Sequence, residues 1–149
     1  MINPVYPEFP FRIDNTGDGT VIFCEIRRRW VKLSPEEWVR QNTYQWLIQT
    51  IMYPKQMVSI EKGIRVVEMS KRYDLLVYDA DFKPWMLIEC KSQSIPLSPD
   101  TLMQVLRYNI ALPVPFLFIT NGDQALVFEK TGTGLVELGE LPNYKKTNN

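Results

Sequence analysis

No histidine occurs among the 149 residues of this chain, and the absence excludes a large part of enzyme chemistry. Serine–histidine–aspartate triads, cysteine–histidine dyads and histidine-ligated zinc all need an imidazole that the chain cannot supply. General-base catalysis by histidine is excluded for the same reason. Any acid–base step must therefore use a Lys, Asp, Glu, Tyr or Cys side chain.

Cysteine is scarce as well: the chain has two, Cys24 and Cys90, and no paired Cys-x-x-Cys motif. This argues against a disulfide framework and against a structural zinc site. Cys90 lies between Glu89 and Lys91, so in a strand its side chain points to the opposite face, into the core. We expect both cysteines to behave as small buried hydrophobic residues.

The chain also lacks net charge, with 17 basic and 17 acidic side chains, so its global electrostatics do not indicate a nucleic-acid binder. Local charge differs. Residues 25–40 carry five basic against three acidic side chains, and residues 55–72 carry five against two. A basic rim around an acidic site explains these runs, and so does an ordinary solvated surface.

No apolar run approaches the roughly 20 residues that a membrane helix needs. The N-terminus lacks the charged-then-apolar pattern of a signal peptide. We therefore expect a cytoplasmic protein with no membrane partner. A length of 149 residues, with 45% hydrophobic and 23% charged side chains, fits one domain, residues 1–149, built around one core.

The sequence contains two clear helix starts. Ser34 is placed as an N-cap with a proline after it, and Glu37 completes a Ser-x-x-Glu capping box. This helix should run to about Met52, because a proline follows soon afterwards. A second helix begins by the same logic after Ser98 and should stop at Pro113.

Apolar segments between and around these helices predict strands. Residues 28–32 and 64–69 should also be extended, with Trp30 facing inward. The order of hairpin, helix, three strands, helix and two strands predicts an α/β (α+β) fold: a mixed central sheet flanked by helices, with an N-terminal β-hairpin. The expected strands are residues 11–13, 21–26, 57–60, 73–78, 85–91, 116–120 and 125–128.

Three charged side chains lie inside two of these apolar runs: Asp74 in the first, Glu89 and Lys91 in the second. A carboxylate in mid-strand needs a reason, because burying an unpaired charge is costly. Two strands joined by a hairpin bring the acids together, and Glu-x-Lys at a period of two turns both side chains to one face. These residues therefore predict a divalent-metal site with a base beside it.

The spacing of Asp74, Glu89 and Lys91 resembles the PD-(D/E)XK nuclease superfamily, whose pattern is an acid on one strand and acid-x-Lys on the next. The proline of that pattern is absent, since a tyrosine precedes Asp74. The resemblance covers roughly residues 34–120 and implies a restriction-endonuclease-like core.

The two predicted helices add to this resemblance. Gln104 and Tyr108, one turn apart, look like the extra motif of the recombination exonuclease branch. Residues 30–41, with their Pro-Glu-Glu-x-Val-Arg-Gln helix start, are similar to the N-terminal nuclease domain of type I restriction enzyme R (restriction) subunits, and so are residues 53–55 and 59–62. The full subunit carries a helicase motor, but this chain has no Gly-x4-Gly-Lys-[Ser/Thr] phosphate loop, so a stand-alone nuclease domain is expected.

The resemblance implies an endonuclease that hydrolyses DNA phosphodiester bonds with Mg²⁺, or with Mn²⁺ as a substitute. Two carboxylates and a strand carbonyl suit Mg²⁺, so Asp74, Glu89 and the backbone carbonyl of Cys90 are the expected ligands. Lys91 would position the attacking water and stabilise the phosphate, acting either as a general base or electrostatically.

Further residues surround this predicted site. In the superfamily a glutamate of the first helix often joins the metal; Glu36 and Glu37 both fit, although the capping box explains Glu37 equally well. Gln104 and Tyr108 would orient Lys91 or the phosphate. DNA is the expected partner, with a motor or restriction subunit encoded elsewhere, or a second copy of the chain in a homodimer. The expected DNA contacts are Arg40, Lys62, Arg72 and Arg107.

Two other interpretations stay open at the level of sequence. The chain can keep the nuclease fold as a non-catalytic nucleic-acid-binding or assembly module, which its neutral charge and missing motor favour. Alternatively, Asp74 and Lys91 form a buried ion pair, an interpretation that leaves Glu89 unexplained.

Overall fold

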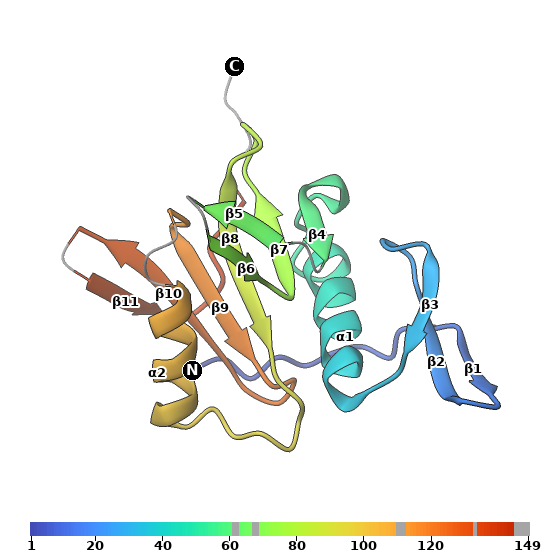
Figure 1. The fold of residues 1–149 in the computed structure, drawn as a ribbon. Coiled ribbons are helices and arrows are strands. Elements are labelled where there is room, and N and C mark those ends of the chain that lie inside the picture. Colours follow the sequence, from blue (N-terminus) through green and yellow to red (C-terminus); the bar gives the residue numbers. More distant parts are fainter. Residues whose placement is uncertain (61–62, 67–68, 110–112, 133, 145–149) are drawn as a thin grey trace.

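A computed structural model describes residues 1–60, 63–66, 69–109, 113–132 and 134–144, without the side chains of 63–66, 69–72, 108 and 109. This part of the chain contains a six-stranded mixed sheet, a three-stranded sheet, a two-stranded hairpin and two α-helices (Figure 1). The α/β (α+β) class expected from the sequence is confirmed.

The central sheet is formed by β4 (Val58–Ile60), β7 (Leu75–Tyr78), β8 (Pro84–Cys90), β9 (Phe116–Thr120), β10 (Ala125–Thr131) and β11 (Gly134–Leu138). Its order is β11-β10-β9-β8-β7-β4. β8 and β9 are parallel, whereas the other neighbouring pairs are antiparallel. A parallel pair needs a long crossover, and this one contains helix α2 (Pro99–Asn109).

Helices cover both faces of the central sheet, and the side chains of β8 show how. Met86, Ile88 and Cys90 belong to the hydrophobic cluster that contains helix α1 (Pro35–Gln49), whereas Leu87 belongs to the cluster that contains α2. This period of two is required of a strand that is buried on both faces. The sheet is therefore the middle layer of the fold.

A smaller sheet lies on the other side of α1 (Figure 1). It consists of β1 (Ile13–Thr16), β2 (Gly19–Cys24) and β3 (Arg29–Lys32), all antiparallel. Phe9 and Cys24 from this region join the same cluster as Val39 and Tyr44 of α1. Helix α1 is thus enclosed between two sheets, and every residue from 39 to 47 is buried.

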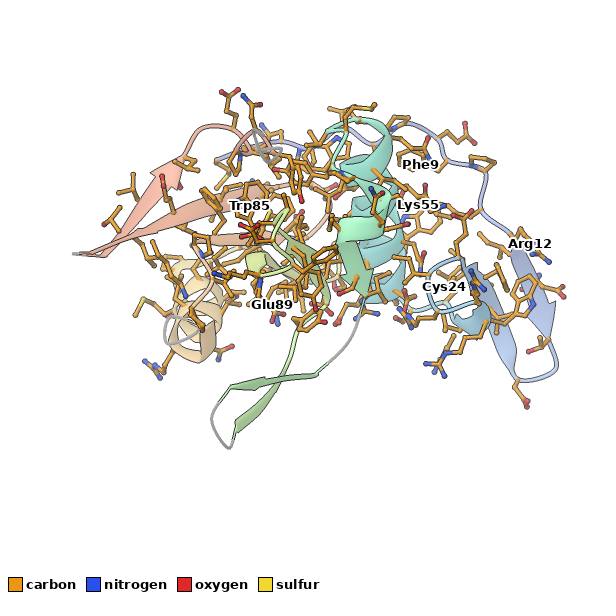
Figure 2. The ribbon with its side chains drawn as sticks, turned by 90° about the horizontal axis from the view of Figure 1, so that it is seen from above. Phe9, Arg12, Cys24, Lys55, Trp85 and Glu89 are labelled. Atoms are coloured by element: carbon orange, nitrogen blue, oxygen red, sulfur yellow. The ribbon has the colours of Figure 1, made fainter. Side chains whose placement is uncertain are left out.

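The remaining elements are short. A 3₁₀ turn, η1 (Lys55–Met57), leads into β4. Strands β5 (Gly63–Val66) and β6 (Met69–Arg72) pair as a hairpin that stands out from the rest of the molecule (Figure 2). Among the described helices, none is long and apolar enough to span a membrane.

Three expectations from the sequence need correction. Helix α1 ends at Gln49 rather than near Met52, because the chain turns into the left-handed region at Met52, where φ is 69°. Trp30 faces solvent and is 41% exposed, although the sequence predicts that it points inward. The strands expected from the sequence do not include β11, on the edge of the central sheet, because its exposed side chains carry no clear alternation.

Candidate functional site

Asp74 and Glu89 meet where β7 begins and β8 ends. The antiparallel register pairs Leu75 with Ile88, so continuing it by one residue sets Asp74 opposite Glu89. The Asp74 N–H donates to the Ile88 carbonyl at 3.2 Å, and the Cys90 N–H donates to Asp74 Oδ2 at 2.7 Å. Backbone pairing of two strands therefore fixes the position of the Asp74 carboxylate.

Arg40 links α1 to this end of the sheet through three carboxylates. Its Nη2 donates to Asp74 Oδ1 at 2.6 Å and to Glu36 Oε1 at 3.1 Å, while its Nη1 donates to Glu37 Oε1 at 2.6 Å. Burial lowers the pKa of Arg40, but the hydrogen bond and charge of Asp74, with the charge of Glu37, outweigh it and leave the pKa raised. Arg40 is a permanent internal cation.

This position corrects the expected role of Arg40 as a DNA contact. Its side chain is buried, and a guanidinium enclosed by three carboxylates offers no free side to a phosphate. The sequence carries a partial signal for this arrangement, since Glu36 and Glu37 precede Arg40 by four and three residues on one helix. Its third partner, Asp74, is 34 residues away, and no local pattern points to it.

Glu37 is buried and bound from several directions. Ser34 Oγ accepts the Glu37 N–H at 3.0 Å, so the N-cap expected from the sequence is present. The Glu37 carboxylate accepts from Arg27 Nη2 at 2.9 and 3.0 Å, from Arg40, and from Gln41 Nε2 at 2.9 Å. With its oxygens engaged in this way, Glu37 is a structural anchor between α1 and the turn that follows β2.

Glu36 is the exposed glutamate of the pair, and the charge of Asp74 acts on it. Burial and the charge of Asp74 raise the pKa of Glu36, while Arg40 and Lys91 lower it. Of the two helix glutamates that the sequence offers for the site, Glu36 is the one with an accessible side chain, 47% exposed.

The pKa of Glu89 is strongly raised by its surroundings. The pKa of Glu89 is raised to about 8, first by burial, then by the charge of Asp74 and a hydrogen-bond contact with it, and last by Glu36, while the charge of Lys91 opposes the rise. Glu36, Asp74 and Glu89 therefore share one neighbourhood. Two cations, Arg40 and Lys91, offset their mutual repulsion only in part.

Lys91 is half-buried beside these carboxylates. Its N–H donates to the Thr120 carbonyl at 2.8 Å, which ties it to β9. In the described part of the chain no ion pair holds its ammonium group, although its charge lowers the pKa of both Glu36 and Glu89. The proposed Asp74–Lys91 ion pair is therefore wrong: the ion-pair partner of Asp74 is Arg40.

The remaining predicted residues are less informative. Cys24 and Cys90 are free and buried, as expected, and burial raises the pKa of the Cys90 thiol. Gln104 and Arg107 are exposed on α2, and no described contact joins them to the carboxylates. Lys62 and the side chains of Arg72 and Tyr108 lie outside the described residues.

The donor atoms suit a hard divalent cation in kind, but they are not arranged around one point. Within the described residues, no group of three or more His, Cys, Asp or Glu side chains is placed to hold a metal ion. Both oxygens of Asp74 are also already bonded, one to Arg40 and the other to the Cys90 N–H. The charge of Asp74 raises the pKa of both Glu36 and Glu89, an arrangement that favours a nearby cation, and oxygen is the ligand that Mg²⁺ prefers.

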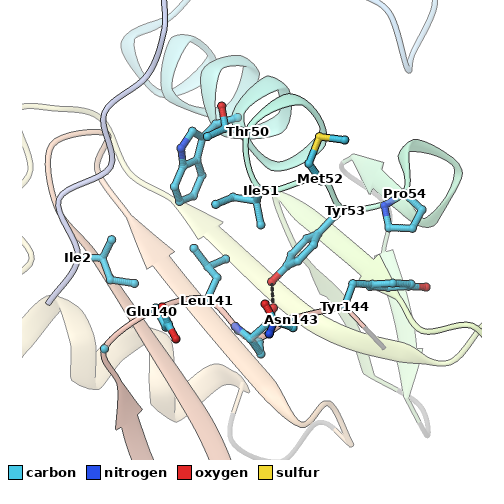
Figure 3. A pocket seen from close by; sticks show the side chains of 13 residues that line it. Ile2, Thr50, Ile51, Met52, Tyr53, Pro54, Glu140, Leu141, Asn143 and Tyr144 are labelled. Carbon is cyan, nitrogen blue, oxygen red and sulfur yellow. Dashed lines mark hydrogen bonds between the residues drawn. The ribbon is translucent and has the colours of Figure 1, made fainter. Parts of the chain in front are cut away.

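A cavity of about 510 Å³ lies at the C-terminal end of α1, whereas Glu36 and Arg40 lie toward its N-terminal end (Figure 3). Its walls are mainly apolar, including Ile2, Ile51 and Leu141, and Tyr53 donates to the Pro142 carbonyl at 2.6 Å beside it. Glu140 is the acidic side chain in its lining. Without paired carboxylates or a cation, this cavity is not a candidate for the chemistry considered above.

The family model described as the type I restriction enzyme R protein N terminus matches residues 35–142 of the chain. The matched region begins at the first residue of α1 and extends past β11. It therefore contains the carboxylate cluster, which consists of Glu36, Asp74 and Glu89. No curated protein matches the sequence.

Proposed function

The chain belongs to the family of type I restriction enzyme R protein N termini, and we propose that it is a Mg²⁺-dependent DNA nuclease domain. The observation that carries the proposal is the meeting of Asp74 and Glu89 at one strand end, with Glu36 and Lys91 close enough to shift the pKa of Glu89. Family membership indicates DNA and other restriction subunits as partners.

Asp74 and Glu89 would hold the ion, with Glu36 or the Cys90 carbonyl as a further ligand. When bound, Mg²⁺ supplies Lewis acidity and lowers the pKa of its water. The chain prepares its ligands beforehand: the Cys90 N–H and Arg40 fix the rotamer of Asp74, at 2.7 and 2.6 Å. Asp74 would hold the ion through oxygens that also accept from Arg40 and from the Cys90 N–H.

Lys91 supplies the mobile positive charge of the site. Its backbone is held by β9, while its ammonium group has no ion-pair partner among the described residues. An ammonium group in this position can approach a phosphate oxygen and stabilise the charge that develops there during hydrolysis. Arg40 cannot play this part, because its guanidinium is already bound to three carboxylates.

The test is a plasmid-nicking assay with Mg²⁺ or Mn²⁺. Asp74→Ala and Lys91→Ala should each reduce the rate about a hundredfold or more, because each removes charge stabilisation at the reacting phosphate. Asp81→Ala and Lys83→Ala are matched controls, since both residues are exposed in the turn between β7 and β8. If both Asp74→Ala and Lys91→Ala still nick the plasmid, the roles proposed for Asp74 and Lys91 are wrong.

A second candidate function is a binding or assembly module that keeps the fold without cleaving. The engagement of both Asp74 oxygens by Arg40 and Cys90 favours it. Isothermal titration with Mn²⁺ separates the two proposals: the nuclease binds the ion and Asp74→Ala does not, whereas the module has no need of an ion at this site.

A further inference from the structure

One face of the β1–β3 sheet carries a row of aromatic and basic side chains, in which the rings of Phe23 and Trp30 meet edge to face and Arg12 lies over both. The register sets Phe23 opposite Trp30, and the Phe23 N–H donates to the Arg12 carbonyl at 2.9 Å, so Arg12, Phe23 and Trp30 cross the sheet side by side. The opposite face presents Ile22 and Cys24, which are fully buried. Alternation places Lys32 on the same face as Trp30, two residues further along β3.

The row is held by cation–π and aromatic contacts. The Arg12 guanidinium carbon lies 4.5 Å from the centroid of the Phe23 ring and 5.3 Å from that of Trp30, and the two rings are 5.6 Å apart. Stacking orders the guanidinium but leaves its N–H donors free. Trp30 remains 41% exposed, which is unusual for the largest apolar side chain.

Of the cations at this sheet, Arg27 binds Glu37, whereas four others have no ion-pair partner among the described residues. In the part of the chain that the structure describes, none of Arg12, Arg28, Arg29 and Lys32 forms an ion pair, and all four are exposed. Arg28 adopts a φ of 52° in the β2–β3 turn, a conformation that glycine or asparagine would accept more easily. By alternation, Asp14 lies on the Trp30 face, where its Oδ1 accepts the Asn15 N–H, and Glu25, which pairs with Lys55 at 3.9 Å, lines the same cavity as Arg12.

The two ends of the row differ. At one end, Arg12 and Phe23 border a cavity of about 140 Å³ that also contains Gln41 and Gln45 of α1. At the other end, Trp30 is open to solvent. Figure 2 shows Arg12 with this sheet at the edge of the molecule, well apart from Glu89.

We propose that this face, the row Arg12–Phe23–Trp30 together with Lys32, binds single-stranded DNA. A base stacks on Trp30, and Arg12 and Lys32 contact the flanking phosphates. An exposed aromatic ring between unpaired cations is the combination that binds single strands, because every base has a stacking face and every nucleotide a phosphate. The choice of DNA as the nucleic acid rests on the proposed nuclease function.

The position of the sheet supports a role in delivering a strand to the carboxylates. Lys32 ends β3, and α1 starts three residues later with Glu36 in its first turn. Arg27, in the β2–β3 turn, binds Glu37 at 2.9 Å and so ties the sheet to that turn of the helix. A strand bound at Trp30 and Lys32 would therefore continue toward the N-terminal end of α1.

The experiment measures fluorescence anisotropy of a labelled oligo-dT of about 20 nucleotides with the full chain in EDTA, so that no cleavage occurs. Trp30→Ala should weaken binding about five- to a hundredfold, whereas Trp30→Phe keeps a stacking face and should retain most of the affinity. Arg12→Ala with Lys32→Ala should weaken binding and lower the salt slope by about 0.7 per lost phosphate contact.

Phe82→Ala and Lys83→Ala are the matched controls, since they remove an exposed aromatic ring and a cation from the distant β7–β8 turn. Unchanged binding in these two variants, with losses at Trp30 and Arg12, supports the proposal. Equal binding by all variants overturns it, and so does tighter binding of a duplex or of oligo-U. Circular dichroism confirms that each variant is folded.

The outcome is separable from that of the proposed nuclease function. If binding depends on Trp30 but the protein does not nick DNA, the proposed binding surface is supported and the proposed nuclease function is contradicted. If nicking depends on Asp74 but binding is unchanged by Trp30→Ala, the nuclease function is supported and the binding surface is contradicted.

Discussion

Glu89 is the carboxylate whose ionisation couples the site to pH. Its pKa is raised to about 8 by burial and by Asp74, against an ordinary value of 4.5. At a pH below 4.5, Glu89 is protonated in both the folded and the unfolded chain. As the pH rises toward 8, the unfolded chain loses the proton first, so the folded state becomes less stable.

We therefore expect Glu89→Gln to flatten the pH dependence of stability in the metal-free protein. The wild type should lose stability between about pH 5 and about pH 8, and the variant should exceed it by about 1 to 2 kcal/mol at the upper end, because glutamine has no proton to lose. Urea unfolding in EDTA at both pH values measures this difference.

Glu8→Gln, at an exposed glutamate near the N-terminus, is the control and should follow the wild type. If the stabilities of the wild type and of Glu89→Gln change with pH in parallel, the pKa of Glu89 is not raised by its neighbours.

At the level of elements, α1 is unusual because it is enclosed without being apolar. Gln41, Asn42, Thr43 and Gln45 are all buried along with its hydrophobic side chains. Several of these polar groups are bonded: the Asn42 amide donates to the Trp38 carbonyl at 2.9 Å, and Thr43 pairs with the Tyr6 hydroxyl at 2.9 Å. The helix therefore depends on the N-terminal segment that covers it.

Removing part of that cover should destabilise the whole fold. Phe9 is buried in the cluster around α1 and stacks edge-on with Phe11, at 6.1 Å between ring centroids. We expect Phe9→Ala to lower the free energy of unfolding by about 3 kcal/mol, because it opens a cavity against the helix. Thermal or urea unfolding provides the measurement.

Val5→Ala is the matched control in the same segment, since Val5 is 82% exposed, and its effect should stay within about 0.5 kcal/mol. A small effect of Phe9→Ala would mean that α1 is stable without the N-terminal segment.

At the level of the whole molecule, the carboxylate cluster exists only because α1 docks against the central sheet. Glu36 comes from the helix, Asp74 from the start of β7 and Glu89 from β8. Arg40 joins the layers through its bonds to Glu36 and Asp74. A cation bound between these layers would therefore stabilise the tertiary structure and not one element alone.

Mn²⁺ should raise the unfolding temperature of the wild type and leave that of Asp74→Asn unchanged. Ligand binding to the folded state alone contributes about 2.7 kcal/mol at a hundred times the dissociation constant, which is readily detected. Differential scanning fluorimetry with increasing Mn²⁺ is the measurement, and Asp81→Asn, at an exposed position, should respond like the wild type. An identical shift in Asp74→Asn would place any bound ion elsewhere.

Local patterns in the sequence predicted much of this architecture. The N-cap at Ser34, the alternation along β8 and the burial of both cysteines follow from rules that act within a few residues. The juxtaposition of Asp74 and Glu89 also follows, because an antiparallel hairpin fixes which residues face each other.

Tertiary structure alone decided the partner of Asp74, the exposure of Trp30 and the pairing of β11. The Arg40–Asp74 bond spans 34 residues and depends on how α1 packs, and β11 is defined mainly by hydrogen bonds to β10. The sequence by itself determined which charged residues approach one sheet end, since strand period and hairpin register are local. Which cation neutralises them depends on the docking of layers, and no pattern along the chain encodes that geometry.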